Sequence, residues 1–445
     1  MHPLSEQRSA VHGRLESLLR PGVRLREVFG WALYDFANSG YATVVLTAVF
    51  SAYFVGVVAG GQALGTLLWT LTLSASNLLV MLTVPLLGAW ADQRQAKRRA
   101  LVWTTLGCVL ATAGLASVGP GQLWLGVILV IISNACFSWG ESLISAFLPG
   151  LARQRAMGRV SGWGWGFGYL GGMLTLGVCL AYVIWAQGQG QQAESFVPVT
   201  MLLTAGIFAV AATISISLLK ERGAQSEACT GQRALQRLSQ TWRHARRYRD
   251  FMWLLGCTVA YMGGVAVAIA LAAIYAQEVI GFGQDETMML IFVLNIAAVF
   301  GALLLGYGQD WIGHKLALTI TLLAWFATCI IAALVSTKGG FWVAATIAGL
   351  SMGASQSVGR AMVGLLSPRD RLAEFYGLWT LATRVASIIG PLMYGLVTWT
   401  TGGDQRLAIA ATSILFVIGL ALLVPINMRR GQQSANPDVE VTEAH

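Results

Sequence analysis

Long apolar runs alternate with short polar connections along nearly the whole chain. A helix needs about 20 apolar residues to cross a bilayer, and runs of that length occur at 28–58, 66–91, 99–118, 122–148, 161–186 and 198–219. A second set follows at 251–277, 286–308, 316–336, 341–366, 374–398 and 405–427. The pattern predicts an all-α integral membrane protein with twelve transmembrane helices.

A polar, basic segment at residues 220–250 separates the two sets of runs. We therefore expect two six-helix bundles, 28–219 and 251–427, joined by a basic linker. A basic N-tail at 1–27 and a C-tail at 428–445 complete this division of the chain.

Composition supports a membrane protein and argues against several other classes. Hydrophobic residues make up 56% of the chain and charged residues only 11%, whereas soluble domains carry about 25% charge. The formal charge of +9 is spread between apolar runs, so we expect no nucleic-acid partner. Histidines occur only in tails and loops and no CxxC pair is present, so we expect no metal site, no cofactor and no enzymatic activity.

The basic residues are distributed asymmetrically over the predicted connections. All but four of the 29 Lys and Arg residues fall in the N-tail, the C-tail, the linker or the connections after even-numbered helices. The four others are Lys338, Arg360, Arg384 and Arg406. By the positive-inside rule both termini should be cytoplasmic. The first 27 residues lack a cleavable apolar core, and we expect a multi-pass protein of a bacterial inner membrane.

A short motif recurs at equivalent places in the two predicted bundles, as expected for a transporter with internal repeats. The motif comprises Gly88, Asp92 and Lys97 in the first half and Gly306, Asp310 and Lys315 in the second. Small residues let helix ends approach closely, and an aspartate there can pair with an arginine or a helix N-terminus. We interpret these residues as a gate; the alternative is that they only satisfy the positive-inside rule.

Several segments resemble known transporters. The segment GAWADQRQAKRR, at 88–99, is similar to the loop that marks the major facilitator superfamily. Within that superfamily, WALYDFANSGY at 31–41 resembles the opening of the vacuolar amino-acid effluxer family. The likeness continues through SAFLPGLARQ at 145–154, GASQSVGR at 353–360 and EFYGLW at 374–379.

The resemblance implies the major facilitator fold, in which two six-helix halves surround a central cavity, and it implies amino-acid efflux. Two positions depart from the family pattern. Gly359 stands where a serine is expected, and Arg384 stands where lysine is common. Both departures bear on substrate choice.

Ionisable residues inside predicted membrane helices are costly and therefore mark candidate functional sites. Asp35 is one, and with Tyr34 and Asn38 it offers hydrogen-bonding groups to a polar solute. A buried carboxyl group could also carry a proton. The alternative is an acid held by an arginine of the N-tail. Gln356, in the GASQSVGR segment, is a further candidate for solute binding.

Three more candidates lie in the fourth, tenth and eleventh predicted helices. Glu141 and Arg360 occupy equivalent repeat positions with opposite charges, so they could pair across the two bundles, either in one conformation or permanently. Arg384 lies near the middle of its helix, where it would bind a substrate anion or form a structural ion pair.

A glycine-rich stretch, GWGWGFGYLGG at 162–172, is best interpreted as a helix face for close packing. Its tryptophans, Trp163 and Trp165, are expected to anchor the helix at a membrane interface.

The sequence therefore predicts a secondary transporter for a small polar solute, in contact with membrane lipid and with a proton as the candidate coupled ion. No GxxxxGK[ST] phosphate-binding loop is present, so we expect no ATP-driven mechanism. Amino-acid efflux is the function that the resemblance implies. Organic anions or peptides are alternative solutes, and a non-transporting receptor or scaffold is an alternative class. A monomer is compatible with this prediction.

Overall fold

The computed structural model describes residues 17–60, 62–222 and 242–436, and these are almost entirely helical. The remaining parts of the predicted N-tail, linker and C-tail lie outside the described residues. The first half contains α2 (Leu25–Tyr41), η1 (Ala42–Ala48), α3 (Phe50–Tyr53), η2 (Phe54–Val58), α4 (Gln62–Gln93), α5 (Lys97–Gly114), η3 (Leu115–Ser117), α6 (Leu123–Ser145), α7 (Leu148–Leu151), η4 (Gln154–Ala156), α8 (Met157–Gly188) and α9 (Ala193–Leu218). The second half contains α11 (Arg249–Glu278), α12 (Gln284–Ile312), α13 (His314–Leu334), α14 (Lys338–Leu366), α15 (Leu372–Thr400), α16 (Gln405–Leu423) and α17 (Met428–Ala435).

The helices correspond to the twelve predicted apolar runs. Within the described residues, eleven helices are long and apolar enough to cross a membrane. The remaining predicted span, the tenth at 341–366, corresponds to α14, which carries Ser355, Gln356, Ser357 and Arg360 and is buried along most of its length. Its polar groups face other helices instead of lipid, so α14 can be less apolar than its neighbours. The structure confirms the predicted all-helical membrane fold.

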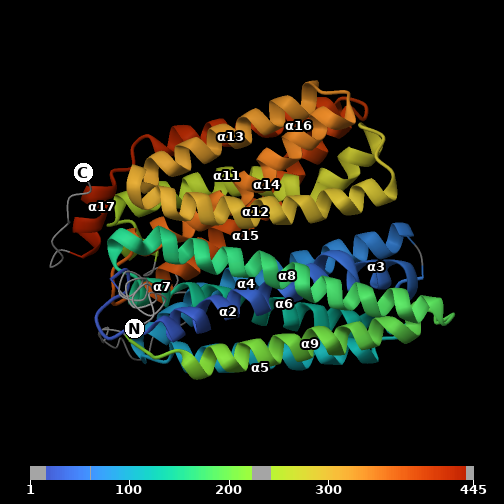
Figure 1. The fold of residues 1–445 in the computed structure, drawn as a ribbon, viewed down its shortest axis with the longest axis horizontal. Coiled ribbons are helices and arrows are strands. Elements are labelled where there is room, and N and C mark those ends of the chain that lie inside the picture. Colours follow the sequence, from blue (N-terminus) through green and yellow to red (C-terminus); the bar gives the residue numbers. More distant parts are fainter. Residues whose placement is uncertain (1–16, 61, 223–241, 437–445) are drawn as a thin grey trace, which may run out of the picture.

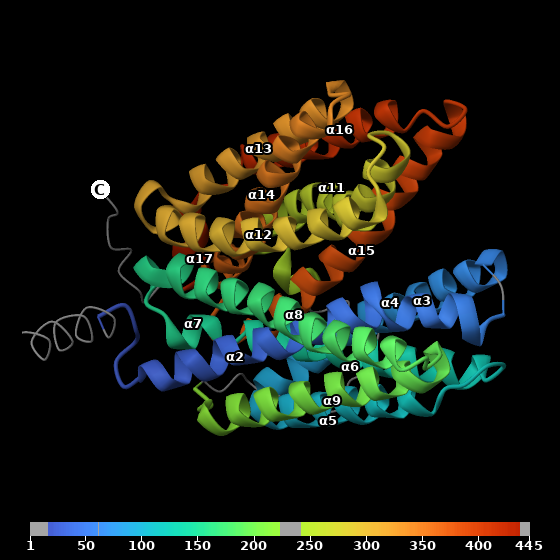
Figure 2. The same ribbon diagram turned by 45° about the vertical axis from the view of Figure 1, so that its right-hand side comes forward.

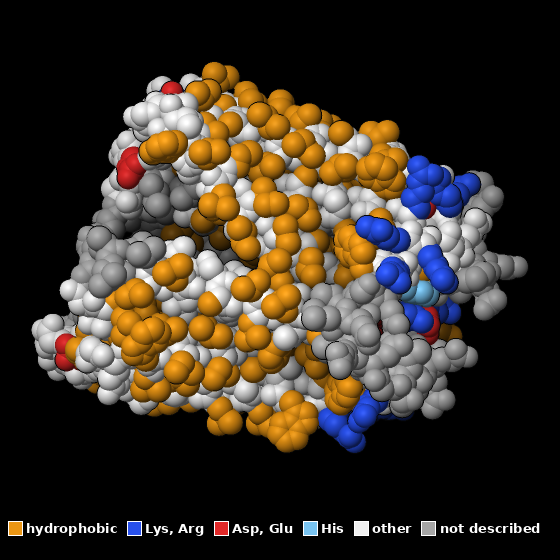
Figure 3. All heavy atoms as spheres, turned by 180° about the vertical axis from the view of Figure 1, so that it is seen from behind, with side chains coloured by type: hydrophobic (Ala, Val, Ile, Leu, Met, Phe, Trp, Pro, Cys, Tyr) orange, Lys and Arg blue, Asp and Glu red, His pale blue; other side chains and the backbone are white. Residues whose placement is uncertain are grey.

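The two halves form two groups of helices that meet along α4, α6 and α8 of the first half and α12, α14 and α15 of the second (Figures 1 and 2). Around the middle of the molecule the surface is rich in apolar side chains, while Lys and Arg side chains gather at one end (Figure 3). We call this the basic end. It holds the connections α4–α5, α12–α13 and α14–α15, and the opposite end is called the far end.

The short C-terminal helix α17 is tied to the second half at the basic end. Arg430 forms an ion pair with Asp250 of α11, with 2.6 Å between Nη2 and Oδ1. Asn427 caps the start of α17 by accepting from the backbone N–H of Arg430. On the first half, Arg222 forms a 2.6 Å ion pair with Glu27 of α2. Parts of both predicted tails and of the linker are therefore packed against the bundles.

Glycine permits the closest helix contact in the second half. A side chain at Gly301 of α12 would collide with the backbone of Leu350 in α14, and one at Gly353 of α14 would collide with the backbone of Ala298. Gly308, also on α12, has open space where a Cβ would lie. Only glycine lets α12 and α14 approach at the first two positions.

We expect Gly301→Val to lower the thermal unfolding midpoint of the detergent-purified protein, because overpacking a close helix contact costs about 1–3 kcal/mol. Gly308→Val is the matched control on the same helix and should leave the midpoint nearly unchanged. Equal midpoints for the two variants would show that the α12–α14 contact does not depend on glycine.

Candidate functional site

A cavity of about 520 Å³ lies between the two halves. Its wall on the first half is largely polar and includes Ser39, Thr43, Thr47 and Tyr169. Its wall on the second half is mostly apolar or aromatic, and includes Leu290, Leu294, Trp325, Phe341, Met352 and Tyr394. Figure 3 shows a hollow between the halves away from the basic end. The cavity thus presents two chemically different walls to a solute.

The first membrane helix changes its winding where it borders this cavity. It is α-helical to Tyr41 and then π-helical through η1. Thr43 donates to the carbonyl of Ser39 at 2.8 Å, and Thr47 donates to the carbonyl of Ala42 at 3.2 Å. Widened turns of this kind are frequent at functional sites. Sequence reasoning missed η1; its only signal was the β-branched run Thr43–Val45.

The cavity is closed toward the basic end by a hydrogen bond across the two halves. Gln356 of α14 donates from Nε2 to the hydroxyl of Tyr169 of α8 at 3.1 Å. Both residues also line the cavity. Of the residues predicted to bind solute, Gln356 is the one that lines this cavity.

One helical turn after Gln356 along α14, Arg360 forms a buried ion pair with Asp35 of α2. The distance from Nη1 to Oδ2 is 2.7 Å, and the two side chains are 2% and 9% exposed. Nη2 of Arg360 also donates to the carbonyl of Ser161 at 3.0 Å. The alternative prediction, in which an N-tail arginine holds Asp35, is wrong, because the partner comes from the other half of the protein.

Aromatic rings and a glycine shape the pocket around this ion pair. The guanidinium carbon of Arg360 lies 4.6 Å from the ring centre of Trp31 and 5.1 Å from that of Trp165, distances at which cation–π attraction operates. A side chain at Gly164 would collide with Arg360 and Asp35. Trp165 was predicted to be an interfacial anchor, and this is wrong because its ring contacts a buried arginine.

A second ion pair joins the halves through α6 and α15. Nη2 of Arg384 lies 3.4 Å from Oε2 of Glu141 and donates to the hydroxyl of Ser138 at 2.8 Å. The side chains of Arg384 and Glu141 are 17% and 33% exposed, so this pair is more open than the first. The predicted pairing of Glu141 with Arg360 is therefore wrong, since each of these residues has another partner.

Asn38 and Tyr34 lie on the face of α2 that packs against α6. Tyr34 is buried, shares a 2.9 Å hydrogen bond with Thr105, and lies against Gly140 of α6. Asn38 is 5% exposed, and neither atom of its amide has a hydrogen-bond partner within the described residues. Such a buried polar group is costly unless a solute or water satisfies it. Tyr34 has a structural contact, whereas Asn38 keeps hydrogen-bonding capacity.

The repeated motif makes equivalent contacts across the halves at the basic end. Asp92 accepts a 2.9 Å hydrogen bond from the backbone N–H of Glu374 in the first turn of α15. Asp310 accepts from the backbone N–H groups of Gly158 and Arg159, at 2.9 and 3.0 Å, at the start of α8. These are the predicted contacts between an aspartate and a helix N-terminus.

The glycines and lysines of the motif are less alike. Gly88 packs on the backbone of Ala373, and Gly306 packs on Gly162, so both glycines allow close approach of the halves. Lys97 pairs with Asp92 at 2.8 Å. Lys315 instead donates to the carbonyls of Val424 and Ile426. The structural equivalence therefore extends to the glycines and aspartates but not to the lysines.

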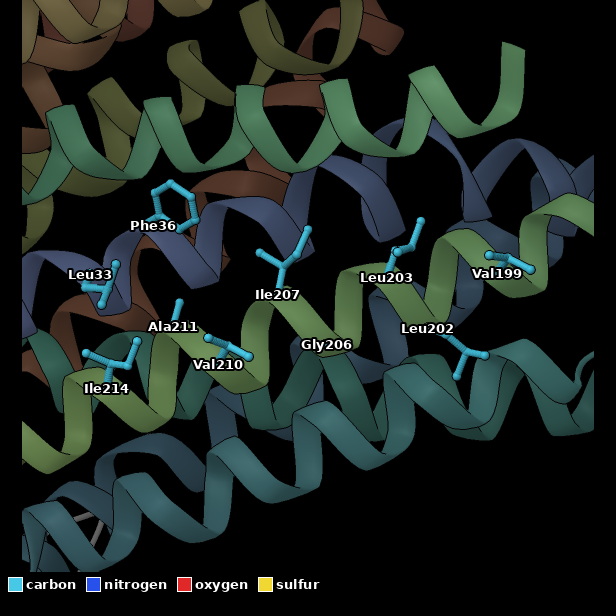
Figure 4. A pocket seen from close by; sticks show the side chains of 10 residues that line it. All are labelled: Leu33, Phe36, Val199, Leu202, Leu203, Gly206, Ile207, Val210, Ala211 and Ile214. Atoms are coloured by element: carbon cyan, nitrogen blue, oxygen red, sulfur yellow. The ribbon is translucent and has the colours of Figure 1, made fainter. Parts of the chain in front are cut away.

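Another hollow, of about 600 Å³, lies on the outer surface between α2 and α9 (Figure 4). It is lined by apolar residues such as Leu33, Phe36, Leu203 and Ile207. It offers no side-chain hydrogen-bonding group to a polar solute, and we do not assign it to the functional site.

Comparison with known proteins finds a family model and relatives that each match most of the chain. The sequence model of the family described as "Vacuole effluxer Atg22 like" matches residues 55–436. A Bacillus subtilis protein named "Uncharacterized MFS-type transporter YxiO" is 27% identical over 400 residues, covering 88% of this chain and 93% of that protein. "Autophagy-related protein 22" of Saccharomyces cerevisiae is 21% identical over 389 residues, covering 76% of this chain and 73% of that protein.

Solved structures with the same fold are more distant in sequence. The human organic anion transporter MFSD10 (TETRAN) superposes with a TM-score of 0.71 at 16% identity, covering 89% of this chain and 99% of that chain. The major facilitator superfamily transporter FucP, in the outward conformation, superposes with a TM-score of 0.71 at 14% identity, covering 90% and 98%. At these identities the structures support the fold alone.

We expect Asp35→Asn to destabilise the protein strongly, because it leaves the charge of Arg360 buried without a partner; breaking a buried pair costs about 3–5 kcal/mol. The double variant Asp35→Asn/Arg360→Gln removes both charges and should recover part of the lost stability. Thermal unfolding of the unsubstituted protein, of Asp35→Asn, of Arg360→Gln and of the double variant measures this coupling. If the two single substitutions simply add in the double variant, the pair is not coupled.

Proposed function

Because the chain belongs to the family described as "Vacuole effluxer Atg22 like", we propose that it exports amino acids by alternating access. It is a secondary transporter of the major facilitator superfamily. The observation that supports this proposal is the cavity between the halves, which is closed toward the basic end by contacts that cross from one half to the other. Transport requires no covalent chemistry, and we propose no enzymatic role.

The two walls of the cavity favour an amino acid with an apolar side chain. The α-amino and α-carboxyl groups would hydrogen-bond at the polar wall, near Ser39, Thr43 and Tyr169. The side chain would lie against the apolar wall, where Trp325 and Phe341 offer large surfaces. Burial of apolar surface would then supply affinity, and hydrogen bonds would orient the solute.

Solute binding can be linked to opening of the basic end through α14. A carboxylate that displaces the Gln356–Tyr169 hydrogen bond would lie one helical turn from Arg360. It would then compete with Asp35 for the guanidinium. A proton on Asp35 would have the same effect, since it removes the charge that holds Arg360. Asp35 and Glu141 are therefore our candidates for proton coupling.

The basic end is proposed to face the cytoplasm, with both termini, in a bacterial inner membrane. The structure then corresponds to an outward-facing state. For the cavity to open inward, the contacts of Asp92 with α15 and of Asp310 with α8 must break, as must the Asp35–Arg360 pair. The residues that line the cavity all belong to one chain, so a monomer suffices for the proposed function.

Other functions remain as alternatives to amino-acid export. MFSD10 is named as an organic anion transporter, and Arg360, one helical turn from the cavity-lining Gln356, would also attract an organic anion or the carboxyl end of a peptide. A non-transporting receptor or scaffold would use the cavity only to sense a solute. Vesicle uptake assays separate this last class from transporters, since a receptor binds without moving solute.

We expect leucine and phenylalanine to raise the unfolding midpoint of the purified protein, because a ligand at a hundredfold excess over Kd adds about 2.7 kcal/mol of stability. Gln356→Ala and Tyr169→Phe should weaken this response. The control Gln187→Ala, at an exposed position near the far end of α8, should not.

Glutamate, lysine, citrate, a tripeptide and glucose complete the ligand panel. A response to citrate alone would replace the amino-acid proposal by organic-anion transport. A response to the tripeptide alone would favour peptides. If no solute of the panel shifts the unfolding midpoint or is taken up by vesicles, the assignment of this cavity to a small polar solute is wrong.

We expect Asp92→Asn/Asp310→Asn to open the basic end more often, because each aspartate loses charge-assisted hydrogen bonds that cross the halves. Ser357→Cys, in a background without other cysteines, places a thiol at a buried position of α14 beside α8 and α12. A membrane-impermeant thiol reagent should label it at least about tenfold faster in inside-out vesicles of the aspartate variant.

The control variant is Glu286→Gln/Lys338→Gln, which removes an exposed ion pair at the far end and should not change the labelling rate. Faster labelling in right-side-out vesicles instead would reverse the proposed orientation. Unchanged labelling in both vesicle types would remove the two aspartates from the gate.

A further inference from the structure

A hollow of about 640 Å³ lies at the basic end, away from the central cavity. It is bordered by η4 of the first half and by the starts of α13 and α17 of the second half. Residues of both halves therefore form its wall in this conformation. The proposed solute site does not include this hollow, and of the repeated motif only Asp310 and Lys315 are part of its wall.

The side chains around this hollow carry positive charge without matching acids. Arg155 and Arg429 have no ion-pair partner within the described part of the chain. Lys315 is held by the carbonyls of Val424 and Ile426, at 2.7 and 2.8 Å, which fix the ammonium but leave its charge uncompensated.

Among the described residues of the wall Asp310 is the one acid, and its carboxylate already has partners. Both carboxylate oxygens of Asp310 accept backbone hydrogen bonds from the start of α8, and Arg159 lies 3.4 Å from one of them. In addition, Gly313 to Leu316 line the hollow as the first turn of α13, where the helix dipole adds positive potential. The net field in the hollow therefore favours an anion.

The hollow opens beside the apolar surface of the protein. Trp311 and Leu316, at the junction of α12 and α13, are 80% and 51% exposed. Leu316, Ile320 and Leu323 follow each other at helical spacing on α13, and all three are exposed. This stripe runs from the edge of the hollow into the membrane span of α13. Acyl chains can lie along such a stripe while a headgroup occupies the hollow.

We propose that the hollow between η4, α13 and α17 binds the phosphate headgroup of an acidic membrane lipid. Basic pockets between membrane helices at the headgroup level are suited to such lipids. The apolar stripe favours a lipid over free phosphate, which shares the same headgroup chemistry. Because Arg155 belongs to the first half and Lys315 and Arg429 to the second, the bound lipid stabilises the conformation in which the basic end is closed.

The test compares two double variants of the full-length protein in detergent. Arg155→Gln/Arg429→Gln removes two charges from the hollow and keeps Lys315, which has a structural contact. Arg243→Gln/Arg247→Gln removes two exposed charges elsewhere at the basic end and serves as the matched control. Each protein is titrated with phosphatidylglycerol, with phosphatidylcholine of the same acyl chains, and with inorganic phosphate, while the unfolding midpoint is followed.

We expect phosphatidylglycerol to raise the midpoint of the unsubstituted protein and of the control. Its apparent affinity should fall about thirtyfold in Arg155→Gln/Arg429→Gln, because two cations are lost. An equal fall in both variants, or an equal response to phosphatidylcholine, would overturn the proposal. If inorganic phosphate reproduces the whole response, the hollow is a site for a free anion and the lipid assignment is wrong. The readout needs no transported solute and is independent of the proposed function.

Discussion

Arg360 cannot remain charged inside the membrane unless another group compensates it, and this requirement ties the two halves together. The carboxylate of Asp35 is 2.7 Å away on α2, in the other half of the chain. Trp31 and Trp165 cover the guanidinium, and Ser161 accepts from it. All of these partners belong to the first half. When the halves separate at this level, the arginine must therefore find water, a solute or another acid.

Nearer the basic end, buried carboxylates are compensated by backbone N–H groups of the opposite half. Asp92 and Asp310 each accept from N–H groups in the first turn of a helix in the opposite half. Free N–H groups at a helix start attract an anion, and they become available again to water when the helices part. Close approach at Gly88 and Gly306 brings the helix ends within reach. The same interaction is thus repeated at two related places in the interface.

The central cavity differs from these contacts because its two walls come from halves with different chemistry. The first half contributes hydroxyl groups along α2, η1 and α8, and the second half contributes mainly apolar and aromatic surface. Among the α14 residues that line the cavity, Gln356 is the polar one. It donates a hydrogen bond to Tyr169 at the end of the cavity toward the basic end. Asn38 and the Glu141–Arg384 pair lie on the side of α2 toward α6 and α15. Polar groups therefore surround α2 on more than one side.

The sequence by itself determined the number and order of the membrane helices, because lipid requires long apolar runs whose backbone groups bond internally. It also indicated the four intramembrane charges and the repeated aspartates, since such residues are rare in apolar runs. The choice of partners was decided by the tertiary structure. Asp35 and Arg360 are 325 positions apart, and Glu141 and Arg384 are 243 apart. One sequence carries no measure of which helix faces meet, so repeat symmetry suggested the wrong pair, Glu141 with Arg360. The packing of α8 against both α2 and α14, with glycine at position 164 leaving room for the two side chains, brings Arg360 to Asp35 instead.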